Sequence, residues 1–282
     1  MHNLDIYEIK KISDNLYAIK EDISNNKFPV IIYLVIGSKK AALIDTGLGT
    51  GNLRKIVESI TKLPILVLHT HGHGDHIGAD GLFDIIYMND KEYDIADNGY
   101  IYNVSKEKKL KFIERLLQDN ADLYEQIKEN IVETINIDYI NINDGDIIDL
   151  GEIQLEAIAT PGHTKGSLSY VNRKDHYAFT GDGIADIHWF DNDAISLEGF
   201  LYTLNHFTQE ASNVENIYAA HLLEAFHLGL VHDLQKAAKE ILEGSNDNIE
   251  NADYEFLKHG KLYAHHTGSA TIYYKKENIY AF

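Results

Sequence analysis

The first third of the chain combines two kinds of hydrophobic pattern. Short apolar runs, broken by Asn, Gly and Lys, are typical of strands joined by tight turns. Apolar residues that recur every three to four positions are typical of an amphipathic helix instead. On these grounds the sequence predicts strands at 16–19, 30–36, 41–44, 65–68 and 84–88, and a helix at 51–62.

The rest of the chain continues with a long helical stretch and further strands. Residues 105–132 carry one apolar stripe, which predicts a helix. Beyond it the pattern predicts helices at 196–207 and 230–242, a polar break at 244–251, and strands at 153–158, 167–171, 176–180, 217–220, 261–264, 270–274 and 279–282. Strand-rich blocks with helices outside them favour layers of helix, sheet, sheet and helix.

Composition restricts the chemistry and the partners. The 282 residues suffice for one large domain or two small ones, and they include no cysteine. Any bound metal must therefore be held by imidazole and carboxylate groups. The net charge of −19 disfavours nucleic acid and anionic membranes as partners. No basic N-terminal region precedes an apolar stretch, and no apolar run approaches the roughly 20 residues that span a bilayer, so we expect a cytoplasmic protein.

A polar loop follows the predicted strand at 65–68, and it holds His71, His73, Asp75 and His76. Glycines between these residues allow the backbone to turn tightly. Residues two apart on an extended segment point the same way, so His71 and His73 can bind one ion. Asp75 and His76 can then reach a second ion. A catalytic metal needs about three protein ligands, so the remaining ligands must come from elsewhere in the chain.

Three further strand ends offer such ligands, namely His163, Asp182 and His221. Each follows an apolar run. A carboxylate can bridge two cations, which makes Asp182 the natural shared ligand. His163 and His221 can then each complete the ligand set of one metal. His227, six residues after His221, is a rival for that last position.

Together with Asp45 in Leu43-Ile44-Asp45-Thr46-Gly47, these motifs resemble those of the metallo-β-lactamase superfamily, in the same order and from about residue 15 to 225. The resemblance implies an α+β fold, a four-layer αββα sandwich with two metals in a cleft at one edge of the sheets. We accordingly expect a single domain over 1–282, with a helical insertion at about 100–135 and a strand-rich C-terminal extension at 252–282.

The resemblance also implies a role for each candidate residue. The first metal would be held by His71, His73 and His163, the second by Asp75, His76 and His221, with Asp182 as the bridge. Asp45 would orient a metal ligand without touching the metal. Asp75 and Asp182 are the expected catalytic carboxylates. Two zinc ions are the expected cofactors, although iron and manganese accept the same ligands.

The reaction that this resemblance implies is hydrolysis of a small ester, thioester, lactone or lactam by a metal-bridging hydroxide. Lactamases that use a cysteine ligand are excluded. The presence of Asp182 favours the glyoxalase II and lactonase branches of the superfamily. Only scattered Lys261, Lys275 and Lys276 are found late in the chain, which disfavours glutathione thioesters as substrates.

Other classes of function stay open. An iron-dependent oxygenase, such as the persulfide dioxygenases of the same superfamily, would use similar ligands. A nuclease or phosphodiesterase is disfavoured by the negative charge.

The Asp-Thr-Gly at Asp45 also occurs in aspartic proteases, but these need two such carboxylates and the chain has one copy. Gly47-x-Gly49-x-Gly51 lacks the third glycine of a dinucleotide loop at the required spacing and indicates a plain turn.

Several aromatic and histidine residues lie outside these motifs. His188 and Trp189 follow Asp182 closely, so they are candidates for a substrate pocket, as is His227. His69 is expected to act as a strand-end group. The pair at 265–266 is expected on the surface or in packing. The apolar stripe of 105–132 is expected to belong to the core, to a cap or to a homodimer contact.

Overall fold

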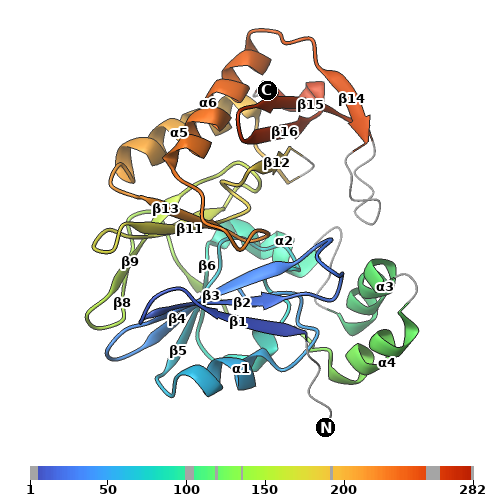
Figure 1. Cartoon of the computed structure of the whole chain (residues 1–282), viewed down its shortest axis with the longest axis vertical. Helices are drawn as coiled ribbons and strands as arrows, with labels where there is room; N and C mark the ends of the chain where they lie inside the picture. The colour runs from blue at the N-terminus through green and yellow to red at the C-terminus, as the bar shows by residue number, and fades with distance from the viewer. Residues whose placement is uncertain are drawn as a thin grey trace. The chain divides into compact units, whose positions relative to one another are not determined.

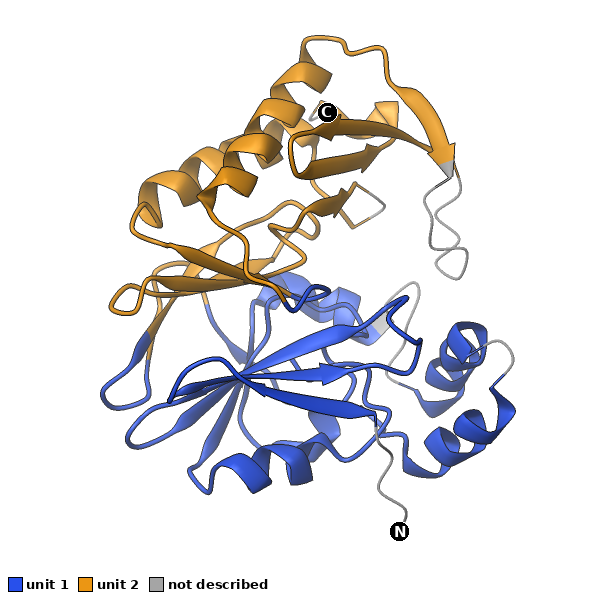
Figure 2. Ribbon diagram, in the orientation of Figure 1, with its two compact units in different colours: residues 1–142, 149–154, 220–223 blue, residues 143–148, 155–219, 224–282 orange. Residues whose placement is uncertain are grey.

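The computed structural model describes residues 6–98, 105–117, 120–134, 136–190, 193–251 and 261–280. The chain forms two compact units, coloured separately in Figure 2. Unit 1 comprises 1–142, 149–154 and 220–223, and unit 2 comprises 143–148, 155–219 and 224–282. The expectation of a single domain therefore stays a prediction. None of the helices in the described ranges is long and apolar enough to cross a membrane.

Unit 1 contains a mixed seven-stranded sheet whose strands lie in chain order (Figure 1). The strands are β1 (Tyr7–Lys11), β2 (Leu16–Glu21), β3 (Val30–Ile36), β4 (Ala41–Ile44), β5 (Ile65–Leu68), β6 (Ile86–Met88) and β7 (Ile140–Asn141). Antiparallel pairing joins β1 to β4, whereas β4 to β7 pair in parallel. The carboxyl ends of β4 and β5 therefore meet at one edge, which is where ligands bind in open sheets of this kind.

The helix α1 (Leu53–Ile60) covers part of this sheet. It begins at Asn52, whose side chain accepts a hydrogen bond from the Lys55 backbone N–H at 3.1 Å. Its apolar stripe, with Leu53 and Val57 fully buried, packs into one hydrophobic cluster with strands β2 to β6. Because α1 lies between β4 and β5 in the chain, this burial holds the connection between these two strands against the sheet.

Unit 2 contains two sheets and two long helices. One sheet has the order β13-β11-β10-β9-β8, and the other has the order β12-β16-β15-β14. Their strands are β8 (Ile147–Asp149), β9 (Gln154–Ala159), β10 (Leu168–Asn172), β11 (Tyr177–Gly181), β12 (Ile187–Trp189), β13 (Asn216–Ala219), β14 (Asn248–Asn251), β15 (Lys261–Thr267) and β16 (Ala270–Tyr274). The helices α5 (Leu197–Glu210) and α6 (Leu228–Leu242) pack against each other and share one apolar core with both sheets (Figure 1).

The predicted helix at 105–132 is wrong in one respect, because the structure has two helices there. They are α3 (Lys106–Leu117) and α4 (Ala121–Asn130), which lie against each other. Asn120 accepts a hydrogen bond from the Leu123 backbone N–H at 3.2 Å and thereby caps a new helix start. The short helix α2 (Tyr93–Asn98) and the single-turn helices η1 (Asp80–Leu82), η2 (Asp90–Glu92) and η3 (Lys276–Asn278) were not predicted.

Two predictions near the C-terminus are also wrong. The polar break at 244–251 contains β14, because β15 supplies backbone partners along its whole length and so overrides the polar composition. The strand at 279–282 is absent over its two described residues. The carbonyl of Ile279 accepts instead from the Glu198 backbone N–H at the start of α5, at 3.1 Å. Residues 252–260, within the expected extension, lie outside the described ranges. The predicted strands at 30–36, 41–44, 65–68 and 270–274 are confirmed with the same ends, and the other predicted strands and helices are present with shifted ends.

His265 on β15 forms a charged clamp in unit 2, for which we predict a pH effect. Its Nδ1 lies 2.8 Å from Asp247 Oδ1 and its Nε2 lies 2.9 Å from Glu240 Oε2. Burial alone would lower the pKa of His265, but the hydrogen bonds to Glu240 and Asp247 outweigh burial and raise it. The clamp therefore stabilises fully below the unfolded pKa of about 6.5, and its contribution is lost as pH rises through the higher folded pKa.

His265→Gln should accordingly lower the urea midpoint more at about pH 5.5 than at about pH 9. The exposed neighbour His266, changed to Gln, serves as the control. An equal loss at both pH values would contradict a clamp that depends on the charge of His265.

Candidate metal centre

The candidate site of unit 1 begins at the carboxyl ends of β4 and β5. The Asp45 backbone N–H donates to the Leu68 carbonyl at 3.1 Å, which continues the pairing of the two strands. Farther along, the Thr46 N–H donates to the His76 carbonyl at 2.6 Å. The loop between these contacts is a tight turn, in which the His76 N–H donates to the His73 carbonyl at 2.9 Å. The four predicted ligands of this loop are therefore held on both sides by backbone hydrogen bonds.

Asp45 connects this loop to the sheet. Its buried carboxylate accepts from the Thr70 N–H at 2.8 Å and from the Thr70 hydroxyl at 2.7 Å. It also lies 2.8 Å from His76 Nδ1 and 3.4 Å from His69 Nδ1. Burial would raise the pKa of Asp45, but His76 and His69 outweigh burial and lower it to about 2. Its backbone has φ +62°, a left-handed conformation that few residues other than Gly, Asn and Asp adopt.

Asp75, His76 and His221 form a group of potential ligand atoms that lies wholly within unit 1. Asp75 Oδ2 lies 3.6 Å from His76 Nε2 and 3.5 Å from His221 Nε2. His221 follows β13, and its Nδ1 lies 2.8 Å from the Pro29 carbonyl. Its ring also packs at 4.6 Å from the ring of Phe28. The three potential ligand atoms all lie within 4.8 Å of one another.

The protonation of the two imidazoles fits a metal. A carbonyl oxygen only accepts, so His221 Nδ1 must donate to Pro29 and the lone pair lies on Nε2. His76 Nδ1 faces the Asp45 carboxylate, which likewise fixes the lone pair on Nε2. Both lone pairs therefore lie near one oxygen of Asp75. This set of two imidazoles and a carboxylate suits zinc, and manganese and iron accept it as well.

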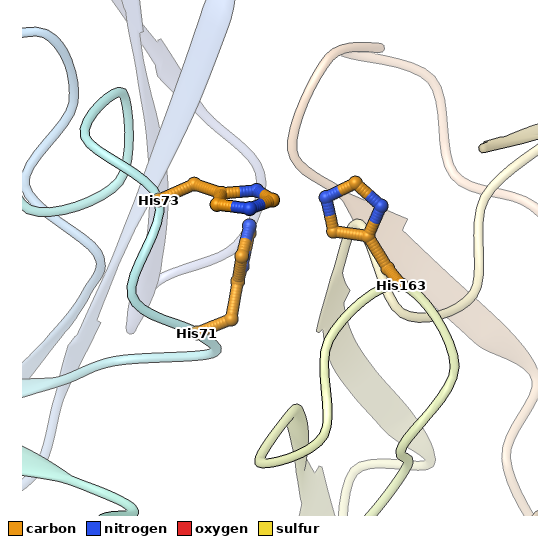
Figure 3. A group of neighbouring side chains, drawn as sticks. All are labelled: His71, His73 and His163. Carbon is orange, nitrogen blue, oxygen red and sulfur yellow. The ribbon is translucent and has the colours of Figure 1, made fainter. Parts of the chain in front are cut away.

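His71 and His73 extend the set of imidazoles on the loop. Their rings are nearly perpendicular (Figure 3). The ring centroids lie 4.8 Å apart and the ring planes meet at 78°. His71 is buried, and its ring centroid lies 4.0 Å from that of His76. Its Nδ1 lies 3.1 Å from the Thr70 hydroxyl. The loop thus brings together the three histidines that the sequence predicted as ligands.

Unit 2 carries the other two predicted ligands, His163 and Asp182. His163 lies in the turn after β9, and its side chain is drawn in Figure 3. Asp182 follows β11 directly. His163 Nε2 lies 3.7 Å from Asp182 Oδ2, and both side chains are largely buried. The two residues are therefore neighbours within unit 2, as an ion-binding role requires.

The three predicted pocket residues of unit 2 lie in different surroundings. Trp189 stacks on Tyr273 with ring centroids 4.5 Å apart. His188, its neighbour on β12, is fully buried, and burial together with His163 holds the pKa of His188 well below its ordinary value. His227 is exposed at the start of α6, where its Nδ1 bonds the Glu215 carbonyl at 2.7 Å. The contacts described for the three residues thus involve different partners.

His69 lies at the end of β5 and bonds a carboxylate with each ring nitrogen, in agreement with its expected role. Its Nε2 lies 3.0 Å from both oxygens of Asp80, a fully buried residue that the sequence did not single out. Burial would lower the pKa of His69, but Asp80 and Asp45 outweigh it and raise the pKa to about 9. Asp80 also accepts from the Thr46 and Tyr139 hydroxyls at 2.7 and 3.1 Å.

Lys109, on α3, is a second buried charge that the sequence did not reveal. Its ammonium donates to the carbonyls of Gly78 and Val132 and to the Thr134 hydroxyl. Burial lowers the pKa of Lys109 to about 8. The position shows no sequence signal, because a lysine on the apolar side of a helix is indistinguishable from one that reaches solvent. Helix α3 is thus bonded to Gly78, which follows the loop of His71 to His76.

Glu92, at the end of η2, supports the loop between His71 and His73. Its buried Oε2 accepts from the Gly72 N–H at 2.8 Å. Glu92→Ala should leave this N–H without its acceptor and weaken zinc binding about tenfold, as the loss of an outer support does in other sites. Glu92→Gln keeps an acceptor oxygen and should stay within a few fold of the wild type.

Zinc titration against a competing chelator measures both Glu92 variants. The prediction fails if the Ala variant binds zinc like the wild type, or if Gln and Ala are equally impaired.

The amino-acid sequence of this chain is similar to those of several known proteins. The sequence profile of the Metallo-beta-lactamase superfamily matches residues 26–226. The acyl-coenzyme A thioesterase MBLAC2 of Homo sapiens is 27% identical over 211 residues, which cover 70% of this chain and 74% of that protein. The hydroxyacylglutathione hydrolase GloC of Haemophilus influenzae is 27% identical over 51% of this chain and 61% of its own length.

Among solved structures, a metallo-beta-lactamase family protein of Thermus thermophilus has a TM-score of 0.60. It is 20% identical, and the match covers 83% of this chain and 82% of that protein. This likeness shows an α+β fold of the same type.

Proposed function

Because this chain belongs to the metallo-β-lactamase superfamily, whose profile matches residues 26–226, we propose that it is a dinuclear metal-dependent hydrolase that cleaves thioesters. The match spans every candidate ligand from His71 to His221. Its fold is the α+β fold of that superfamily.

The observation that carries the proposal is the group formed by Asp75, His76 and His221. Three side chains from distant parts of the sequence place ligand atoms within 4.8 Å of one another. Each imidazole has its Nδ1 held by an acceptor, so that Nε2 carries the lone pair. Placing three polar ligand atoms in a largely buried position is costly without a cation to bind them.

The ligand sets that we propose follow the family pattern. Asp75, His76 and His221 would hold one metal, and His71, His73 and His163 the other, with Asp182 shared. Asp45 would orient His76 through the hydrogen bond to Nδ1. When bound, the metals would lower the pKa of a bound water and polarise the scissile carbonyl. The protein's own contribution is to fix the imidazole lone pairs through the hydrogen-bond partners of each Nδ1.

The thioester substrate is proposed from the relatives. One is named an acyl-coenzyme A thioesterase and another a hydroxyacylglutathione hydrolase, so both names refer to acyl groups carried on sulfur. A thiolate is a good leaving group, so its departure needs no strong general acid among the side chains. Esters, lactones and lactams share the carbonyl and serve as the competing substrates.

Elemental analysis and a substrate panel test the proposal. We expect about two zinc or manganese ions per chain, and faster turnover of acyl-coenzyme A than of an ester, lactone or lactam with the same acyl group. Release of the free thiol gives the rate. One iron per chain with oxygen consumption would overturn the hydrolase. Two metals with preferred lactone cleavage would overturn the thioester assignment alone.

A further inference from the structure

His188 occupies an unusual position in unit 2. Its side chain is fully buried, and within the described part of the chain neither ring nitrogen has a hydrogen-bond partner. A neutral imidazole carries one donor and one acceptor, and burying both without partners destabilises a protein. Packing alone would be better served by a phenylalanine at this position. Buried unsatisfied groups of this kind are uncommon and call for a physical explanation.

The ring of His188 is held by aromatic neighbours. It stacks on Phe200 of α5 with centroids 4.1 Å apart and planes at 18°, and Phe190 packs at 4.8 Å. On β12 it points to the side opposite Trp189, which stacks on Tyr273. The stack uses the faces of the ring and leaves the nitrogens at its edge. The orientation of that edge is therefore fixed by packing.

The turn that carries His163 lies directly against this stack. A Cβ atom at Gly162 would come within 2.5 Å of Phe200 Cδ2 and 3.4 Å of His188 Cε1, so only glycine fits there. The Gly162 carbonyl also accepts from the Ile195 N–H at 3.0 Å. The rings of His163 and His188 meet edge to face, with centroids 6.1 Å apart and planes at 79°. His188 is thus a buried, edge-to-face neighbour of His163.

We propose that His188 is a positioning residue that orients the His163 imidazole for metal binding. This inference rests on the proposed function, in which His163 is a ligand. His188 is not itself a ligand, because its nitrogens belong to none of the groups of ligand atoms found among the described residues. Its buried edge supplies a hydrogen-bonding partner to the loaded site, directly or through one water molecule. Residues that support a ligand in this way set metal affinity.

His188→Phe and His188→Gln test this role in opposite directions. Phe keeps the stack on Phe200 and removes both nitrogens, so it should raise the melting temperature of the metal-free chain by a few degrees. It should also weaken binding of one of two metals about 10- to 100-fold and shift the visible spectrum of the cobalt-substituted chain. Gln keeps a donor and an acceptor but loses the stack. It should be less stable than Phe and should bind metal more tightly.

If the Phe variant is the more stable and the Gln variant binds metal more tightly, a positioning role is supported. A residue that only packs would change stability and metal affinity in the same direction. A Phe variant that is more stable, with unchanged metal affinity and an unchanged cobalt spectrum, would overturn the inference and leave the hydrolase standing. A Gln variant weaker than Phe in metal affinity would also overturn it. Failure of the wild-type chain to bind any metal would instead overturn the proposed function and this inference with it.

Discussion

Asp75→Asn is expected to remove one metal ion per chain and to lower kcat/KM for the thioester at least about a thousandfold, a transition-state loss of about 4 kcal/mol. The reason is geometric. One oxygen of Asp75 lies 3.5 to 3.6 Å from the Nε2 atoms of both His76 and His221. An amide oxygen carries no charge and is a poor zinc ligand beside imidazole. The change is isosteric at a partly exposed side chain, so the fold should persist.

Elemental analysis and the melting temperature separate loss of metal from loss of fold in the Asp75 variant. Asp14→Asn, a change at a fully exposed aspartate that pairs with Lys11, is the matched control for removing one negative charge. It should leave metal content and turnover unchanged. An Asp75 variant that keeps two metals and at least a tenth of wild-type turnover would refute the assignment of Asp75.

Asp45→Ala is expected to destabilise the metal-free chain by about 3–5 kcal/mol, the usual loss when one member of a buried ionic network is removed. The carboxylate accepts from Thr70 and faces both His69 and His76, so alanine leaves these buried groups without their acceptor. Alanine also fits the φ of +62° poorly. Asp45→Asn tolerates that backbone and keeps one acceptor oxygen, so it should lose less.

The same carboxylate predicts how stability depends on pH in a chelator-treated sample. The folded pKa of Asp45 is about 2, below the unfolded value of about 3.9. Its stabilisation is therefore present above about pH 4 and is lost as pH falls toward 2. His69 has a folded pKa of about 9, so its stabilisation is present below about pH 6.5 and is lost as pH rises through 9.

Urea unfolding of the wild type and both Asp45 variants across this range checks the prediction. The fall in stability from about pH 4 to pH 2 should be shallower in Asp45→Ala, because the group that titrates there is gone. If stability falls equally between about pH 4 and pH 2 in the wild type and in Asp45→Ala, Asp45 is not the group responsible.

The sequence predicted strands β2 to β6 of unit 1 and the polar loop, because both depend on local order, whereas the edge strands β1 and β7 were not predicted. A continuous apolar run such as β3 can only be a buried element, and the loop of His71 to His76 concentrates its ligand candidates within six residues. The sequence also singled out His221, which the structure brings beside Asp75 and His76. That these residues bind metal stays a prediction.

The features that the sequence did not reveal depend on distant contacts. Asp80 and Glu92 look like ordinary surface acids until the fold buries them against His69 and the Gly72 N–H. His188 follows Asp182 in the sequence like a pocket residue, yet it stacks inside the core on Phe200. The strand β14 has polar composition and forms because β15 pairs with it. In each case the deciding partner is remote in sequence.

Lys109 gives helices α3 and α4 different tolerance to change. Loss of α3 would remove the cation that bonds Gly78, Val132 and Thr134, and Gly78 lies two residues after His76. On α4 only Ile127 is fully buried. A change on α4 should therefore disturb the loop of His71 to His76 less than the same change on α3. A graft or a fluorescent label that must not disturb the metal site belongs on α4.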